Sequence, residues 1–414
     1  MVANRAGRSK SMRSFQHRNF KLFFISNFLS NVGGWAQRVA QDWLVLQLTH
    51  SGRELGIVTG LQFAPSLLFS VYGGSLADRL NKRKLLMITN AGSALCALLL
   101  GILVMSHSVQ LWHVYVIAVL LGTFGALDAP TRQAFTSEMV GKSDVANAVS
   151  LNSANFNAGR LVGPGLSGLL IAWFGTGPSF IFNAASYIVV LGALVAVDES
   201  ALFLEKKQEF EVKSMDALRY VRARPQIMAV MATVFFMGTF GLNFQIFNAL
   251  MATQIFHRGP AIYGLLGSVI AIGSLSAGIT SARMDRKRGP RFIMAGAMIF
   301  GSWLAVVAWM PTFLLYLVTL PIAGFFALTT MINANSFVQN STDAHIKGRV
   351  MGLYLLAFMG GTPFGSPLIG WMCQKIGVRE TISACGAIAA GAALVISLVL
   401  KSRQAKSIQL APQQ

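Results

Sequence analysis

A charged stretch separates two long apolar runs near the start of the chain: Gly73-Gly74-Ser75-Leu76-Ala77-Asp78-Arg79-Leu80-Asn81-Lys82-Arg83-Lys84. It carries four cations and one carboxylate, and the run on each side is long enough to cross a bilayer. Loops of this composition lie on the cytoplasmic side of membranes. A looser copy occurs in the second half, Ala282-Arg283-Met284-Asp285-Arg286-Lys287-Arg288-Gly289. The two charged loops predict a membrane protein with two related halves.

The composition also indicates a membrane protein. Of the 414 residues, 54% are hydrophobic and only 12% are charged, which exceeds what the core of a soluble domain requires. The net charge of +19 could suggest a nucleic-acid-binding protein, but the cations lie between apolar runs and not on a soluble module. We therefore expect the lipid bilayer as a partner and no nucleic acid.

Twelve mostly apolar runs of roughly 18 to 27 residues can cross a bilayer. They lie near residues 20–48, 55–77, 85–106, 111–134, 147–173, 178–198, 226–252, 260–282, 290–310, 311–333, 349–373 and 379–400. Prolines stand at or just before five proposed starts, where a missing N–H costs least: Pro178, Pro225, Pro260, Pro290 and Pro311. The first run carries Arg38 and Asp42 and is too long for a signal peptide, so we interpret it as an uncleaved span.

These runs divide the chain into a cytoplasmic tail 1–19, a six-helix bundle 20–198, a cytoplasmic linker 199–225, a second six-helix bundle 226–400 and a cytoplasmic tail 401–414. In the linker, Met215, Leu218 and Val221 stand at helical spacing, which predicts a short amphipathic helix on the membrane surface. We expect this helix to connect the bundles, with a regulatory docking site as the alternative.

Lys and Arg are distributed unevenly between the two sides of the predicted membrane domain. The side that holds both tails and both charged loops has 28 of them, the opposite side has four, and Arg38 and Arg160 lie within spans. By the positive-inside rule, both termini are predicted to be cytoplasmic.

An internal repeat relates the halves. A shift of 202 residues superposes Gly122 on Gly324, Phe135 on Phe337, Gly159 on Gly361, Gly163 on Gly365 and Gly168 on Gly370. Matches at one offset predict parallel repeats around a central cavity. The predicted fold is an all-α membrane protein of twelve transmembrane helices in two parallel six-helix repeats.

One face of the first span carries the richest set of polar side chains. Within about 60° of arc, at 100° per residue, lie Asn27, Asn31, Arg38 and Asp42, with Gln41 beside them. Because polar groups are costly in a bilayer, a stripe this narrow is expected to face a cavity and line the path of substrate or protons. Arg38 and Asp42 are also spaced for an ion pair that only packs the bundle, so both interpretations stay open.

Asp128 lies toward the cytoplasmic end of the fourth span. A carboxylate there could exchange a proton as a cavity opens and closes. It could equally be the permanent partner of Arg79, Arg83 or Arg132.

The fifth span combines a cation with small residues. The residues that permit close packing and a bend are Gly159, Gly163, Pro164 and Gly168, with Gly361 and Gly365 as counterparts in the second half. Arg160 lies about halfway across the membrane, where a cation is functional by default. It could pair with Asp42 or with an anionic substrate, and the alternative is a buried structural arginine.

Several chemistries lack the residues they need. The sequence contains no G-x-x-x-x-G-K-[ST] phosphate loop, no metal-ligand cluster and no G-x-S-x-G or H-E-x-x-H motif. We expect no enzyme activity, no metal and no cofactor, and we expect Cys96, Cys373 and Cys385 to be free thiols. The second half has no charge clearly within a span, so the candidates for a proton-carrying side chain lie in the first half.

Two motifs resemble those of the major facilitator superfamily. The first charged loop is similar to its motif G-x-L-A-D-R-x-G-R-K, matched by Gly74, Leu76, Ala77, Asp78, Arg79, Lys82 and Arg83. Asn81 replaces the second glycine, and Asn tolerates the left-handed conformation. The run from Gly159 to Gly168 resembles the helix-five motif G-x-x-x-G-P-x-x-G-G, with Ser167 in place of one glycine. In the family that motif is associated with proton-coupled exporters.

Three short segments resemble the enterobactin-exporter-like and macrolide-efflux-like bacterial branch: Phe15 to Phe23, Gln41 to Val45 and Asp128 to Ala134. The resemblance implies alternating access and proton-driven export of a small organic molecule, of the drug or siderophore class, across the bacterial cytoplasmic membrane. We expect a monomer that binds this substrate and protons. The alternatives are an uncoupled uniporter or lysolipid flippase of the same fold and, with least support, a non-transporting receptor or scaffold.

The same loop predicts a cytoplasmic gate. Asp78, Arg79 and Asp128 are expected to form a charge cluster that holds the outward-facing state closed. The residues assigned to this gate are Gly74, Asp78, Arg79, Lys82, Arg83, Asp128 and Arg132.

Overall fold

The computed structural model describes residues 10–203, 214–283 and 288–409, and within residues 70–79 it describes the backbone alone. The predictions for the tail up to residue 9, for residues 204–213 and 284–287 and for the last five residues lie outside the described part. The predictions for the side chains of Asp78 and Arg79 also lie outside the described part. The described residues form helices and connecting turns only.

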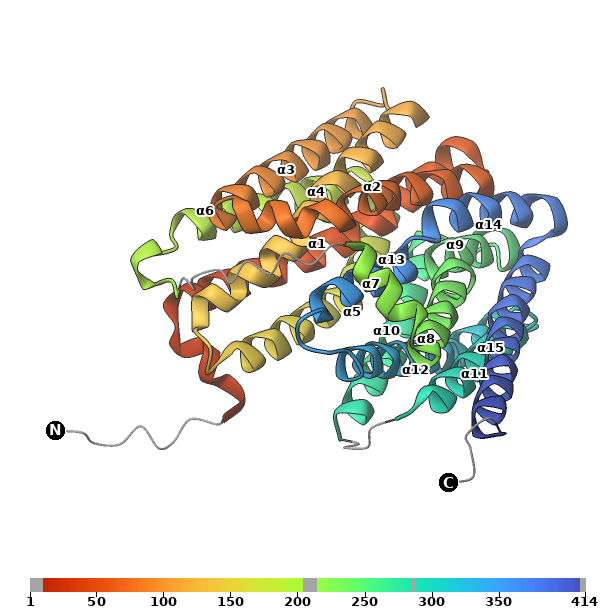
Figure 1. Ribbon diagram of the computed structural model, residues 1–414. Helices are drawn as coiled ribbons and strands as arrows, with labels where there is room; N and C mark the ends of the chain where they lie inside the picture. Colours follow the sequence, from red (N-terminus) through yellow and green to blue (C-terminus); the bar gives the residue numbers. More distant parts are fainter. Residues whose placement is uncertain (1–9, 204–213, 284–287, 410–414) are drawn as a thin grey trace.

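The helices form two groups that lie side by side (Figure 1). The first group is α1 (Arg18–Thr49), α2 (Gly52–Arg79), α3 (Lys82–Met105), α4 (Leu111–Val140), α5 (Val145–Phe174) and α6 (Gly177–Val195). The second group is α8 (Pro225–Phe236), α9 (Phe244–Leu250), α10 (Pro260–Arg283), α11 (Pro290–Val307), α12 (Phe313–Asn340), α13 (Lys347–Met359), α14 (Thr362–Ile376) and α15 (Val378–Gln409). The short elements are η1 (Lys10–Gln16), η2 (Glu199–Ala201) and α7 (Ser214–Arg222), with π-helical turns η3 (Met237–Gly241) and η4 (Met251–Ile255).

The start of α1 and the end of α15 lie on the same side of the molecule (Figure 1). We call this side the terminal end, and the side that carries the turn between α1 and α2 the opposite end. Prolines open α6, α8, α10 and α11 as predicted, because a proline in the first turn removes no helical hydrogen bond. The three cysteines are buried and free.

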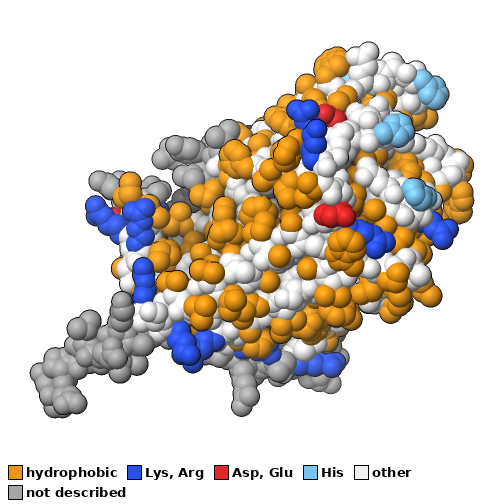
Figure 2. All heavy atoms as spheres, turned by 90° about the vertical axis from the view of Figure 1, so that its right-hand side faces the viewer, with side chains coloured by type: hydrophobic (Ala, Val, Ile, Leu, Met, Phe, Trp, Pro, Cys, Tyr) orange, Lys and Arg blue, Asp and Glu red, His pale blue; other side chains and the backbone are white. Residues whose placement is uncertain are grey.

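Eight helical segments of the described part are long and apolar enough to cross a membrane. The outer surface suits a lipid environment, since Trp173, Phe364 and Leu314 are 70%, 74% and 65% exposed. Figure 2 shows apolar side chains over most of one face. Four predicted spans are not among the eight: 20–48, 55–77, 147–173 and 349–373. Polar side chains reduce the hydropathy of α1 and α5, and the last of the four is not one helix.

Two predicted spans are interrupted, which corrects the expectation of continuous helices. The run 349–373 breaks at Gly360 and Gly361 into α13 and α14. The run 226–252 contains the π-helical turn η3, after which the side chain of Asn243 donates to the carbonyl of Thr239 (2.8 Å). A polar side chain can replace a lost backbone donor in this way, so Asn243 pairs one carbonyl of the interrupted turn.

The first charged loop is mostly helical. Because α2 continues to Arg79 and α3 begins at Lys82, only Leu80 and Asn81 form the turn. The expectation of a left-handed Asn81 is wrong, since its φ is −64°. Instead, its side chain accepts a hydrogen bond from the backbone N–H of Lys84 (3.1 Å) and caps α3.

The linker contains the predicted short helix, α7, but the face that is buried is not the predicted one. Ala217 and Val221 are buried, whereas Met215 is 61% exposed. The helix packs against α13, and Ala217 and Val221 belong to one apolar cluster with Val350 and Ile346. This contact fixes the linker helix to the second group.

The two groups contact each other mainly near the opposite end, through α2 with α14 and α5 with α10. Small residues permit these contacts. A Cβ atom on Gly168 of α5 would lie 3.0 Å from Cα of Gly264 on α10, and one on Gly60 of α2 would lie 2.9 Å from Cγ of Pro367 on α14. Toward the terminal end the two groups diverge (Figure 1).

Candidate functional site

A cavity of about 210 Å³ lies among the helices of the first group. Its lining residues are Ser30, Asn31, Gly34, Trp35, Gln37, Arg38, Gln41, Gln62, Ser93, Leu121, Gly125, Asp128, Arg132, Phe156, Asn183 and Tyr187. Three residues of the predicted stripe, Asn31, Arg38 and Gln41, are therefore on its wall. Asn27 is buried, and Asp42 lies outside the lining.

Arg38 and Arg160 meet at one aromatic ring. Their guanidinium carbons lie 4.8 Å and 5.7 Å from the centroid of Trp35, and Phe156 contacts the same ring edge-on at 5.7 Å. Such cation–π contacts are worth about 0.5–2 kcal/mol. Within the described residues neither arginine is within 4.0 Å of a carboxylate oxygen, so the anticipated ion pair between Arg38 and Asp42 is not formed.

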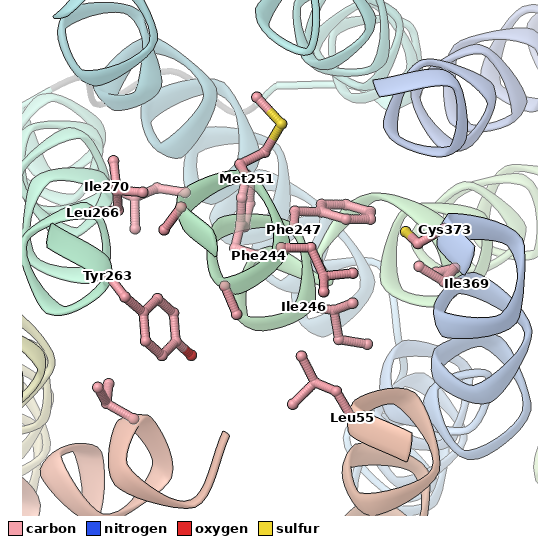
Figure 3. Packing of buried hydrophobic residues seen from close by; sticks show 14 of the residues in the cluster. Leu55, Phe244, Ile246, Phe247, Met251, Tyr263, Leu266, Ile270, Ile369 and Cys373 are labelled. Atoms are coloured by element: carbon pink, nitrogen blue, oxygen red, sulfur yellow. The ribbon is translucent and has the colours of Figure 1, made fainter. Parts of the chain in front are cut away.

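Asp42 is held instead by the second group of helices. Its carboxylate accepts hydrogen bonds from Tyr263 Oη of α10 (2.7 Å) and from Gln245 Nε2 of α9 (3.4 Å), and only 3% of the residue is exposed. Trp43 stacks on Tyr263 at 6.3 Å between centroids. Figure 3 shows Tyr263 to one side of the apolar packing around Phe244 and Phe247, with Leu55 of α2 and Ile369 of α14 on the other. Asp42 therefore lies where the two groups meet, within one turn of Arg38 and Gln41.

Asp128 and Arg132 form a hydrogen-bonded pair at the cavity wall. Arg132 donates from Nε to Oδ2 (2.6 Å) and from Nη2 to Oδ1 (2.9 Å). Asp128 Oδ1 also accepts from Thr89 (3.1 Å) and Asn90 (2.9 Å), while Arg132 donates to Asn27. Of the partners considered for Asp128 whose side chains the structure describes, Arg132 is in contact, whereas Arg83 pairs with Glu199.

Lys82 and Arg83 are paired within the first group. Lys82 contacts Glu138 (2.6 Å), and Arg83 contacts Glu199 and donates to the carbonyls of Leu194 (2.7 Å) and Val195 (2.8 Å). These pairs tie α3 to α4 and to the end of α6. The cluster of Asp78, Arg79 and Asp128 was predicted for an arrangement in which the two groups are closed at the terminal end. It stays a prediction.

Replacing Asp128 by alanine is expected to destabilise the protein by on the order of 3 kcal/mol. The substitution leaves Arg132 without its carboxylate in a half-buried site, and breaking a buried pair costs about 3–5 kcal/mol. Thermal unfolding in detergent measures the effect. Asp216→Ala is the control, because its pair with Arg219 is exposed, 4.0 Å long and expected to contribute less than about 1 kcal/mol. Equal midpoints for the two variants would contradict the prediction.

The small residues predicted for packing lie at helix crossings. Gly159 and Gly163 of α5 face α1, where added Cβ atoms would lie 2.6 Å from the Cβ atoms of Asn31 and Trp35. Gly361 and Gly365, next to and within α14, both face Thr239 of η3. Pro164 is inside α5, and its ring contacts Gly267 of α10.

Tyr263 is the site residue that sequence reasoning missed. It lies on α10, whose other polar side chains before Arg283 are only serines and a threonine, and its partner Asp42 is 221 residues away in the sequence. Thr89, Asn90 and Tyr187 were also missed. The helical spacing of Ser179, Asn183, Ser186 and Tyr187 on α6 is a signal that could have found Tyr187. Among the described residues, no group of three His, Cys, Asp or Glu side chains could hold a metal ion.

Two contacting groups of apolar helices, with a polar cavity in the first group and a buried carboxylate where the groups meet, are the arrangement of a membrane transporter of the major facilitator type. The chain belongs to the transmembrane secretion effector family of this superfamily, whose model matches residues 9–414.

Curated relatives align over most of the chain. The staphyloferrin A transporter of Staphylococcus aureus is 23% identical over 368 residues, covering 88% of this chain and 92% of that protein. The multidrug efflux pump Tap of Mycolicibacterium fortuitum is 29% identical over 380 residues, covering 88% and 91%. The enterobactin exporter EntS of Salmonella typhimurium is 22% identical over 386 residues, covering 93% and 92%.

Solved structures share the fold. A bacterial homologue of the human lysosomal transporter Spinster, in an inward-facing and unoccupied conformation, superposes with a TM-score of 0.74 at 15% identity, covering 94% of this chain and 98% of that one. A POT family transporter in complex with 5-aminolevulinic acid gives 0.71 at 12% identity, covering 92% and 96%.

Proposed function

We propose that the protein is a proton-coupled exporter that moves a small organic molecule out of a bacterial cell by alternating access. The observation that carries the proposal is Asp42, a buried carboxylate whose donors Tyr263 and Gln245 belong to the other group of helices. Separation of the groups removes both donors, so the proton affinity of Asp42 differs between the two arrangements. A group with this property couples proton binding to the conformational exchange.

The cavity lies beside this carboxylate, as transport requires. Arg38 and Gln41 on its wall are within one turn of Asp42. The groups contact each other near the opposite end and diverge toward the terminal end. We assign the terminal end to the cytoplasm, because 28 of the 34 Lys and Arg residues fall on that side of the predicted topology. The described arrangement is then the one that loads substrate from inside the cell.

The helices support twelve membrane crossings in two repeats, within residues 20–198 and 226–400. In this count α8 with α9 makes one crossing, and α13 with α14 makes another. Equivalent contacts in the two repeats support this count. Gly159 packs on α1, the first crossing of the first repeat. Gly361 is its counterpart at the shift of 202 residues and packs on η3, in the first crossing of the second repeat. Each repeat would then move largely as a unit.

The relatives support the direction and the substrate class. Two of their names specify export or efflux, one of enterobactin and one of multiple drugs, and a third names a staphyloferrin A transporter. We extend to this chain the export of a siderophore-class or drug-class molecule across the cytoplasmic membrane. We expect it to act as a monomer.

Transport by purified protein in liposomes tests the proposal. Compounds that raise the melting temperature of the protein would be loaded under an imposed pH gradient. Substrate is expected to accumulate against its gradient as protons run down theirs, and a protonophore is expected to abolish the accumulation. Transport at the same rate with and without the gradient would reject proton coupling and favour a uniporter or a lipid flippase.

A further inference from the structure

We propose that Arg38 and Arg160, with Gln41, form a binding site for an organic anion that also carries a hydroxyl or amide hydrogen-bond donor. This inference rests on the proposed transport function and specifies the class of its substrate.

Neither arginine has a direct carboxylate partner among the described residues. Both contact Trp35, at 4.8 Å and 5.7 Å, and neither has a hydrogen bond or an ion pair with a carboxylate in the described part of the chain. The nearby carboxylates have other partners. Asp42 accepts from Tyr263 and Gln245, and Asp128 is held by Arg132.

Two cations at one ring within a membrane are unfavourable without an anion. Cation–π contacts stabilise a charge only weakly, whereas removing an ion from water costs much more. An arginine presents paired N–H donors that fit carboxylate oxygens in a two-point contact. A ligand carboxylate that contacts Arg38 on the cavity wall and reaches Arg160 at the same ring would offset both the desolvation and the mutual repulsion.

Gln41 adds a second, independent requirement. It is 1% exposed, lines the cavity, and its Oε1 is a buried acceptor that no described residue pairs by a hydrogen bond. A buried acceptor without a donor is destabilising, because the water that it loses is not replaced by a protein donor. Because Gln41 follows Arg38 by three residues on α1, a ligand held by Arg38 can place a hydroxyl or amide N–H at Oε1.

The apolar part of the wall suits an organic body. Trp35 and Phe156 are in edge-on contact, and Gly34 of the same lining leaves open space, since a Cβ atom there would meet no described atom within 4 Å. Pockets that combine aromatic walls with a few fixed polar groups are typical of small-molecule sites. Inorganic anions would use the arginines alone and leave these surfaces uncovered.

The test measures the melting temperature of the purified full-length protein with salicylate and tartrate, each compared with its neutral amide, and with benzoate. The hydroxylated anions are expected to raise the melting temperature by about 3 °C or more at saturation, the amides by none, and benzoate, which lacks the hydroxyl group, by less. In Arg38→Gln and Arg160→Gln the rise should disappear, and in Arg38→Lys it should persist at higher ligand concentration. Gln41→Leu should make salicylate and benzoate equal.

Equal shifts with acids and amides, no shift with either hydroxylated anion, or an unchanged shift in the double variant R38Q/R160Q would each overturn the inference. Melting without ligand shows whether each variant is folded. The result is separable from the proposed transport function. Proton-driven transport of neutral compounds without anion binding would support the exporter proposal and reject the anion site. Anion binding without proton-driven transport would support the anion site and reject the exporter proposal.

Discussion

Replacing Asp42 by asparagine is expected to abolish proton-driven transport while leaving substrate exchange intact. The carboxylate is 3% exposed and accepts hydrogen bonds from Tyr263 at 2.7 Å and Gln245 at 3.4 Å across the junction of the two groups. An asparagine oxygen can accept from the same donors, so the packing of the junction is retained. It cannot bind and release a proton, so transport loses its link to the gradient.

The measurement compares two modes in the same liposomes. Accumulation under an imposed pH gradient should fall to the level of empty liposomes in Asp42→Asn, whereas exchange of internal for external substrate without a gradient should continue. Tyr263→Phe should keep coupling but shift its pH dependence, because one donor to the carboxylate is lost.

Asp128→Asn is the matched control. It removes a carboxylate of the same helix bundle that is already paired with Arg132, so proton-driven accumulation per folded molecule should persist. If Asp128→Asn loses coupling and Asp42→Asn keeps it, the proton carrier is Asp128, the second candidate that the sequence offered.

Much of the first group's polar surface could be predicted because helical periodicity alone determines which side chains share a face. Asn31, Arg38 and Gln41 have that spacing, and all three line one cavity. The partner of Asp42 could not be predicted in this way, since Tyr263 follows it by 221 residues and their contact depends on how two bundles dock. The i, i+4 spacing instead suggested Arg38, one turn away, as an ion-pair partner of Asp42. The structure places Arg38 against Trp35.

Helix starts were predictable where prolines mark them, as at Pro260 and Pro290, because proline acts locally. The interruptions were not. In the turn before Asn243, the side chain of Asn243 replaces a lost backbone donor. Ser366 of α14 holds that side chain by donating to Asn243 Oδ1 at 2.8 Å. Apolar content gives no sign of a contact between helices so distant in sequence. The cap at Asn81 was also missed, because the glycine in the motif suggested a left-handed turn and not a side-chain acceptor.

Replacing Gly168 by leucine is expected to shift the protein away from the described arrangement and to stop transport. A Cβ atom there would lie 2.8 Å from the carbonyl oxygen of Pro260 and 3.0 Å from Cα of Gly264, both of them backbone atoms of α10. Ordinary contacts between non-bonded carbon atoms are about 3.5–4.0 Å, so α5 and α10 must move apart. Overpacking of this kind costs about 1–3 kcal/mol, and 1.4 kcal/mol changes a conformational equilibrium about tenfold. The cost falls on this arrangement alone, because separation of the two groups at the opposite end relieves it.

Spin labels at Ser106 and Arg258, exposed positions of the two groups near the opposite end, report the separation in a variant without the native cysteines. Gly168→Leu should move the distance distribution to longer values and reduce substrate exchange along with proton-driven accumulation, which distinguishes it from Asp42→Asn. Gly192→Leu is the matched control, since that glycine of α6 has nothing within 4 Å of an added Cβ atom. If the label distances of Gly168→Leu stay at the wild-type values, the contact between α5 and α10 is not the one that closes this end.

Transport should return in part with Gly168→Ala, because a methyl group requires a smaller displacement of α10 than an isobutyl group does. A graded loss from glycine to alanine to leucine identifies steric separation as the cause.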